Sequence, residues 1–168
     1  INAFADVQDF LISEFFKAIK EKNPNHVKVV TYRNNTRQFI NNTVHHAVFG
    51  PDANPFEEGE LIIFNDSFGE IENATEAQVV TVSPADKDQN GIQYVDLEIV
   101  YDNRLTTIPV VLESDKKKFN DIVSEKFKVA FAAKGTFAYS RLLQEAWAYK
   151  QAFANIDYGY AITSHKSQ

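Results

Sequence analysis

The first third of the chain switches between helical and extended patterns of apolar residues. Apolar residues recur at helical spacing over Phe4–Lys20, until a stretch containing Pro24 interrupts the pattern. Val27–Tyr32 is β-branched and almost wholly apolar, which predicts a strand buried on both faces. A second helical pattern follows and ends at Gly50-Pro51. Three residues can cap this second helix: Asn34, Asn35 and Thr36. Helix, strand and helix in this order predict a parallel α/β sheet.

From Pro55 the pattern changes to short apolar runs with alternating polar positions. Four runs predict strands: Gly59–Asp66, Ala77–Pro84, Ile92–Asp102 and Leu105–Leu112. Turn-forming pairs such as Asn90-Gly91 and Asp102-Asn103 separate them. Closely spaced short strands of this kind predict a small antiparallel barrel, SH3-like or OB-like, inserted into the α/β sheet.

The last third returns to helical spacing and then closes on a strand. Two helices are predicted over Ser114–Lys134 and Phe137–Ile156, followed by a strand over Asp157–Ile162. Six polar residues, Thr163–Gln168, then crowd the end of this strand, where α/β folds keep their chemistry. The chain also begins without Met, so both ends are expected to be truncated.

Composition and charge narrow the class of protein. The length of 168 residues fits one domain, or one domain carrying a small insertion. The composition, 44% hydrophobic and 24% charged, is ordinary for a soluble globular protein. There is no Cys, so disulfides and thiolate metal sites are excluded. No apolar run reaches the length of a membrane span, and no signal peptide is evident, so we expect a cytoplasmic protein with no membrane partner. The net charge of −6 counts against nucleic-acid binding by the whole surface, although not by a local strip.

The end of the chain resembles motif V of superfamily-1 DNA helicases of the RecD/Dda type, which typically reads Tyr-Ala-x-Thr-x-His-Lys-Ser-Gln-Gly. Seven residues match: Tyr160, Ala161, Thr163, His165, Lys166, Ser167 and Gln168. Upstream, Thr31–Asn35 ("TYRNN") resembles motif IV of the same family, which has an aromatic residue, Arg or Thr, and then Asn. The resemblance covers nearly the whole chain and implies the second RecA-like domain of such a helicase.

The resemblance implies an α/β fold class: a partial RecA-like parallel sheet with helices, interrupted by a small antiparallel SH3-like β-barrel. Residues 1–55 would form the first part of the RecA-like domain and residues 56–112 the inserted barrel. Residues 113–168 would form a helical segment and the return to the RecA-like domain, ending within motif V.

The resemblance also implies roles for particular residues. Tyr32 would stack on adenine and Arg33 would contact the γ-phosphate, while Gln168, with Ser167, would lie toward the ATP cleft. Four residues would line the path of single-stranded DNA: Thr163, Ser164, His165 and Lys166. Without the resemblance, Tyr32 reads as a core residue at a strand end, Arg33 as a solvated side chain, and the terminal segment as a polar loop.

The implied activity belongs to a larger protein. The chain has no G-x-x-x-x-G-K-[ST] loop and no credible Mg²⁺-binding Asp-Glu pair, so it is not expected to hydrolyse ATP by itself. The intact enzyme would use ATP and Mg²⁺, and the isolated fragment is expected to bind neither tightly. Its partners would be single-stranded DNA and the missing N-terminal RecA-like domain, with translocation from 5′ to 3′.

Other interpretations remain open from the sequence. The predicted barrel is rich in carboxylates, which repel a phosphate backbone, so the chain could be a non-catalytic module whose barrel binds a protein or nucleic acid. It could also be a RecD-type subunit of a helicase–nuclease complex.

Several further residues have simple structural readings. Lys116, Lys117 and Lys118 are expected to be a solvated helix start, and Glu57, Glu58 and Glu60 a solvated loop. We expect core packing for Trp147 and Phe153. His45 and His46 are not expected to bind metal, because adjacent residues do not share a helix face.

Overall fold

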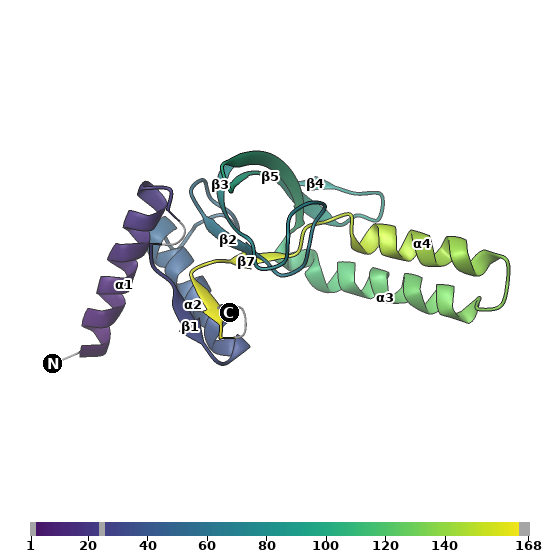
Figure 1. Ribbon diagram of the computed structural model, residues 1–168, viewed down its shortest axis with the longest axis horizontal. Coiled ribbons are helices and arrows are strands. Elements are labelled where there is room, and N and C mark those ends of the chain that lie inside the picture. Colours follow the sequence, from purple (N-terminus) through teal and green to yellow (C-terminus); the bar gives the residue numbers. More distant parts are fainter. Residues whose placement is uncertain (1–2, 24–25, 165–168) are drawn as a thin grey trace.

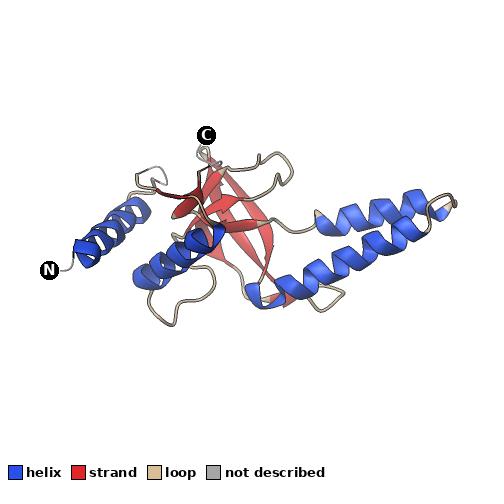
Figure 2. Ribbon diagram, turned by 90° about the horizontal axis from the view of Figure 1, so that it is seen from below, coloured by secondary structure: helices blue, strands red, loops and turns tan. Residues whose placement is uncertain are grey.

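The computed structural model describes residues 3–23 and 26–164 as a mixed α/β structure with a parallel sheet and an antiparallel sheet (Figure 1). Helices α1 and α2 lie at one end, and the hairpin of α3 and α4 projects from the other end. The antiparallel sheet lies between them (Figure 2). The chain is therefore elongated, with its two helical regions separated by the sheet.

The parallel sheet pairs a strand of the first third of the chain with a strand of the last third. In the described part of the chain it consists of β1 (Val29–Thr31) and β8 (Ala161–Thr163). Helices α1 (Ala3–Lys20) and α2 (Asn34–Phe49) pack with these strands around a shared apolar core. The helix–strand–helix order predicted from the apolar spacing is confirmed, and so is the parallel pairing.

The antiparallel sheet contains all four strands that the alternating pattern predicts. Its described strands are β2 (Leu61–Phe64), β3 (Glu76–Val82), β4 (Asp86–Lys87), β5 (Gln93–Tyr101), β6 (Arg104–Val111) and β7 (Ile156–Tyr158). Strands β4, β5, β3, β2 and β7 follow one another across the sheet, and β6 pairs with β5 along its whole length. The β5–β6 turn has two residues with positive φ, Asp102 at 46° and Asn103 at 60°, as a tight hairpin requires.

This sheet curls around its own apolar core without closing into a barrel among the described residues (Figure 1). Strands β4, β6 and β7 each pair with a single neighbour among the described strands, so the open edges of the sheet lie there. One backbone hydrogen bond, from the N–H of Ala154 to the C=O of Pro109 at 2.8 Å, joins the segment before β7 to β6. The predicted small barrel is thus observed as a curled, open antiparallel sheet.

The two projecting helices come directly after strand β6 in the sequence. A short 3₁₀ turn, η1 (Glu113–Asp115), leads into α3 (Lys116–Ala132), which packs along α4 (Ala138–Lys150). Aromatic rings hold the base of this hairpin to the sheet: Phe153 packs against Tyr94 of β5 and against Phe119 of α3. None of the helices in the described ranges is both long and apolar enough to cross a bilayer.

Four local predictions are wrong. The first strand is not buried on both faces, because Val30 is 54% exposed and the parallel sheet has only one covered face there. No side chain caps α2: the helix begins at Asn34, and Arg33 occupies the cap position without a side-chain hydrogen bond. The predicted strand Asp157–Ile162 is two strands in two sheets, divided at Gly159 and Tyr160. Trp147 is 44% exposed, because its ring packs against one side of α3 only.

The contact between Tyr149 of α4 and Asp88 of the β4–β5 turn should make the stability of the fold depend on pH. Burial alone would raise the pKa of Asp88, but hydrogen bonds from the Tyr149 hydroxyl and from two backbone amides hold that pKa below its ordinary value of 3.8. Burial and the same contact raise the pKa of Tyr149 to about 12. The pair therefore stabilises the fold above pH 3.8, loses this effect as Asp88 is protonated at lower pH, and loses it again as Tyr149 ionises between pH 10 and about 12.

We expect Tyr149→Phe to lower the free energy of unfolding by about 1 kcal/mol at pH 7. The difference from wild type should shrink as the pH falls below 3.8. Urea unfolding over a pH series measures both effects. Tyr139→Phe on the same helix is the control. A loss for Tyr149→Phe that does not change with pH would contradict the role of the Asp88 carboxylate.

Candidate functional site

The C-terminal ends of β1 and β8 lie side by side at one edge of the parallel sheet. The strands pair with Thr31 opposite Thr163. The N–H of Ser164 donates to the C=O of Thr31 at 2.8 Å and carries the pairing one residue further. Both segments singled out in the sequence, Tyr32–Arg33 and Thr163–Ser164, therefore leave the sheet from the same edge, where open α/β sheets bind their ligands.

Tyr32 and Arg33 are presented to solvent at this edge. The side chain of Tyr32 is 91% exposed, and that of Arg33 is exposed too. In the described part of the chain, no hydrogen bond or ion pair engages the Arg33 guanidinium. Helix α2 begins directly after Arg33, whose side chain makes no capping hydrogen bond to the described first turn of the helix. An exposed aromatic ring, a guanidinium and a helix N-terminus together suit a ligand with a planar group and a phosphate.

At the end of β8, Thr163 is buried, whereas Ser164, which follows the strand, is partly exposed. The side chain of Thr163 is only 3% exposed, whereas that of Ser164 is half-buried. The hydroxyl of Thr31 donates to the C=O of Arg33 at 3.2 Å, which fixes the turn between β1 and α2. The other predicted site residues, His165, Lys166 and Gln168, lie outside the described residues, as does Ser167.

Asn41 of α2 fixes the start of β8 through its side-chain amide. Its Oδ1 accepts from the N–H of Tyr160 at 3.0 Å and from the N–H of Ala161 at 2.7 Å. Its Nδ2 donates to the C=O of Ala161 at 3.2 Å. The buried amide thus pairs with β8 much as a neighbouring strand would, on the side that β1 does not occupy.

One turn further along α2, His45 belongs to a buried polar cluster with Glu60 and Tyr160. The Nδ1–H of His45 donates to Oε1 of Glu60 at 2.5 Å, and the hydroxyl of Tyr160 donates to Oε2 of the same carboxylate. The His45 ring also stacks on Tyr158, with ring centroids 4.5 Å apart. The expectation that Glu60 lies in a solvated loop is wrong: its residue is 0% exposed, because it directly precedes the buried strand β2.

The pKa values of Glu60 and Tyr160 are both raised in this cluster. Burial raises the pKa of Glu60 above its ordinary value, although hydrogen bonds from His45 and Tyr160 oppose the shift. Burial and the Glu60 carboxylate hold the pKa of Tyr160 well above its ordinary range. The Tyr160 hydroxyl therefore remains a hydrogen-bond donor at physiological pH.

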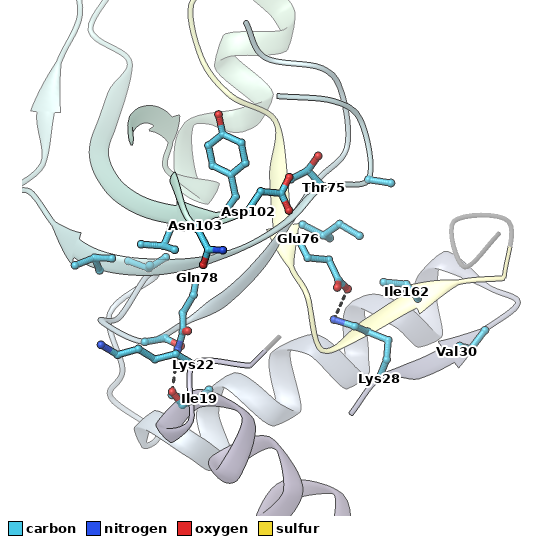
Figure 3. A pocket seen from close by; sticks show the side chains of 17 residues that line it. Ile19, Lys22, Lys28, Val30, Thr75, Glu76, Gln78, Asp102, Asn103 and Ile162 are labelled. Carbon is cyan, nitrogen blue, oxygen red and sulfur yellow. Dashed lines mark hydrogen bonds and ion pairs between the residues drawn. The ribbon is translucent and has the colours of Figure 1, made fainter. Parts of the chain in front are cut away.

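A groove of about 920 Å³ separates the parallel sheet from the antiparallel sheet (Figure 3). The exposed side chain of Val30 lines one side. Two contacts cross between the walls: Lys28 Nζ lies 2.6 Å from Oε1 of Glu76, and Gln78 Nε2 donates to the C=O of Ile19 at 3.0 Å. Because Glu76 neutralises Lys28, this groove is less suited to a phosphate than the sheet edge is.

The described residues contain no arrangement of three or more His, Cys, Asp or Glu side chains that could hold a metal ion. His45 is committed to Glu60, while the exposed His46 points its ring to the helix terminus at Gly50, where Nδ1 lies 3.4 Å from the C=O. The sheet edge supplies aromatic, cationic and hydroxyl groups instead.

Comparison with known proteins identifies no family for this chain. No protein-family model matches the chain, and no curated protein matches it. Any functional conclusion therefore depends on the residues and their contacts.

Sequence reasoning missed Asn41, His45 and Glu60. Asn41 and His45 are spaced by four residues on the helix face that also carries the buried Val44, so a polar pair on an apolar face was the available signal. Glu60 stands directly before the apolar run of β2, unlike the exposed Glu58. Buried polar groups require partners, and that rule would have directed attention to these residues.

We expect Asn41→Ala to lower the free energy of unfolding by about 3 kcal/mol, because two buried backbone N–H groups would lose their acceptor. Asn42→Ala, at the next and exposed position, should change it by less than about 0.5 kcal/mol. Urea unfolding of both variants measures the difference. Similar values for the two would show that the Asn41 amide does not hold β8.

Proposed function

We propose that this chain is part of an ATP-dependent DNA helicase of the RecD/Dda type, where it contributes one wall of the ATP cleft and part of the single-stranded DNA track. The observation that carries the proposal is the parallel pairing of β1 with β8. This pairing brings the motif IV-like segment at Tyr32–Arg33 beside the motif V-like segment at Thr163–Ser164. Two segments that are 131 residues apart in the sequence thus meet at the sheet edge where α/β proteins bind ligands.

The fold proposed for this function is a partial RecA-like domain interrupted by an SH3-like insertion. The order of elements supports it: β1 and α2 precede the antiparallel sheet, and β8 follows it. The curled sheet of short strands and its own apolar core suit an inserted unit. The helical hairpin α3–α4 then returns the chain toward β8 (Figure 1).

On the nucleotide side, Tyr32 and Arg33 are the residues that fit ATP. An exposed aromatic ring can stack on adenine, and a guanidinium can bind phosphate oxygens in a bidentate manner. In the intact protein the missing N-terminal RecA-like domain would supply the P-loop and the Mg²⁺ site, and Gln168 would face the same cleft. ATP binding would supply the energy that closes the two domains.

On the DNA side, the proposed contacts are Ser164, His165 and Lys166, with Thr163 supporting them from within the sheet. Hydroxyl, imidazole and ammonium groups after a strand suit phosphate oxygens of a single strand. The translocation direction proposed for the intact protein is 5′ to 3′, and its location cytoplasmic. Assembly as a RecD-type subunit of a helicase–nuclease complex uses the same contacts.

A protein-binding module is the second candidate. Exposed carboxylates lie on the loops and on strand β4 of the antiparallel sheet: Glu58, Asp66, Glu70, Glu72 and Asp86. Such a surface repels a phosphate backbone and suits a basic protein surface. In this alternative the sheet edge at Tyr32 would have no catalytic consequence.

The decisive assay is ATP hydrolysis by the intact protein with and without single-stranded DNA. We expect DNA to stimulate turnover and Arg33→Ala to lower the stimulated kcat by about tenfold or more. Lys166→Ala should raise the DNA concentration for half-maximal stimulation and reduce the salt slope of binding by about 1. Tyr32→Ala should raise the KM for ATP, whereas Tyr32→Phe should not.

Lys117→Ala is the matched control, because that ammonium lies on α3, is 90% exposed and pairs with Asp121 at 2.9 Å. It should leave every parameter unchanged. An intact protein whose turnover does not respond to DNA would contradict the helicase proposal, and the acidic module would then be the better account.

A further inference from the structure

The buried carboxylate of Glu60 is the point at which three parts of the structure meet. Its backbone belongs to the antiparallel sheet: the C=O of Glu60 accepts from the N–H of Val79 at 2.9 Å. Its side chain accepts from His45 of α2 and from Tyr160, which stands directly before β8. Glu60 thus links all three parts, to β3 through its backbone C=O and to α2 and Tyr160 through its carboxylate, and all three side chains are almost fully buried.

The chain between Tyr160 and the sheet edge has little freedom. The C=O of Tyr160 accepts from the N–H of Val29 at 3.0 Å, and β8 pairs with β1 from Ala161 onward. Within the described residues, the N–H of Ser164 continues this pairing to the C=O of Thr31. A displacement of Tyr160 is therefore carried through three paired residues to Ser164. Strand segments transmit such shifts because their backbone hydrogen bonds fix the register.

The segment before Tyr160 is equally constrained. The N–H of Gly159 donates to the C=O of Leu61 at 2.8 Å. A Cβ atom at Gly159 would lie 3.1 Å from backbone atoms of Ile62, so no side chain fits there without a shift of β2. The crossover from β7 to β8 is thus pressed against β2, whose first residue follows Glu60.

Stability alone does not account for a carboxylate at this position. Burying a charge is costly, and an apolar residue of similar volume is often neutral or stabilising in its place. A buried carboxylate with two donors does impose one geometry on them, because both hydrogen bonds must be kept. The cluster is therefore better suited to fixing position than to adding stability.

We propose that Glu60 is a positioning residue that, through Tyr160 and His45, sets the placement of the Thr163–Ser164 edge relative to the antiparallel sheet. Its effect on DNA rests on the function proposed above, whereas its effect on β8 does not. The antiparallel sheet and the Thr163–Ser164 edge then move as one body. A ligand contact that displaces the antiparallel sheet therefore also displaces the DNA-facing edge.

The test uses Glu60→Gln and Tyr160→Phe in the intact protein. Glu60→Gln keeps the shape and removes the charge, and Tyr160→Phe keeps the ring that packs edge-to-face on Phe15 while removing the hydroxyl. Glu58→Gln, an exposed carboxylate two residues away, is the matched control. The first measurement is site-resolved amide hydrogen exchange.

Both variants should exchange about tenfold faster at the amides of Ala161 and Ser164, with no change at Leu97 and Ile99 in the centre of β5. A uniform increase across the chain would indicate a merely stabilising cluster and overturn the proposal. Unchanged exchange at Ser164 would overturn it too. This measurement is independent of any enzymatic activity.

The second measurement is DNA-stimulated ATP hydrolysis. The two variants should need about tenfold more single-stranded DNA for half-maximal stimulation, while kcat at saturating DNA and the KM for ATP stay within about twofold of wild type. Faster exchange at Ser164 with unaltered DNA dependence would overturn the coupling to DNA. If the wild type itself shows no stimulation, the proposed function fails, and the exchange data alone decide whether Glu60 positions β8.

Discussion

The burial of one carboxylate, that of Glu60, is the constraint around which the two sheets are arranged. A buried ionisable group is tolerated only where donors reach it, and here the donors come from α2 and from the crossover before β8. Helix α2 must therefore lie against the crossover with His45 facing inward. The same placement brings Asn41, one turn earlier, to the backbone of Tyr160 and Ala161. One polar requirement thus sets the packing of α2 as well as the start of β8.

The two sheets are continuous in the chain at this point. Strand β7 closes the edge of the antiparallel sheet, Gly159 turns against β2, and β8 begins two residues later in the parallel sheet. Ion pairs lie on both sides of the crossover: Arg37 with Asp157 at 2.7 Å, and Lys28 with Glu76 at 2.6 Å. Half-buried pairs of this kind add little stability, yet they restrict how the sheets can rotate relative to one another. The placement of the sheet edge at Tyr32 thus depends on these ion pairs with residues of the antiparallel sheet.

Much of this architecture could be predicted from local pattern, because helices and strands are defined by spacing. The helix at Phe4–Lys20 and the pair of strands around Asp102-Asn103 followed in this way. Contacts distant in sequence did not. Glu60 resembled its exposed neighbour Glu58, because Tyr160, one of its partners, is 100 residues away. The last strand looked continuous, since alternation records burial and not which sheet a residue joins.

The acidic composition and a polyanionic ligand are compatible because electrostatics is local in salt. At physiological ionic strength charges are screened over about 8 Å, so carboxylates beyond that range contribute little at the sheet edge. There the nearest groups decide: the Arg33 guanidinium, which pairs with none of the described residues, and the amide end of a sixteen-residue helix. Under the proposed function, exposed carboxylates on the antiparallel sheet would confine a nucleic acid to this edge and weaken its binding elsewhere. A net charge of −6 thus favours a narrow track over a broad basic surface.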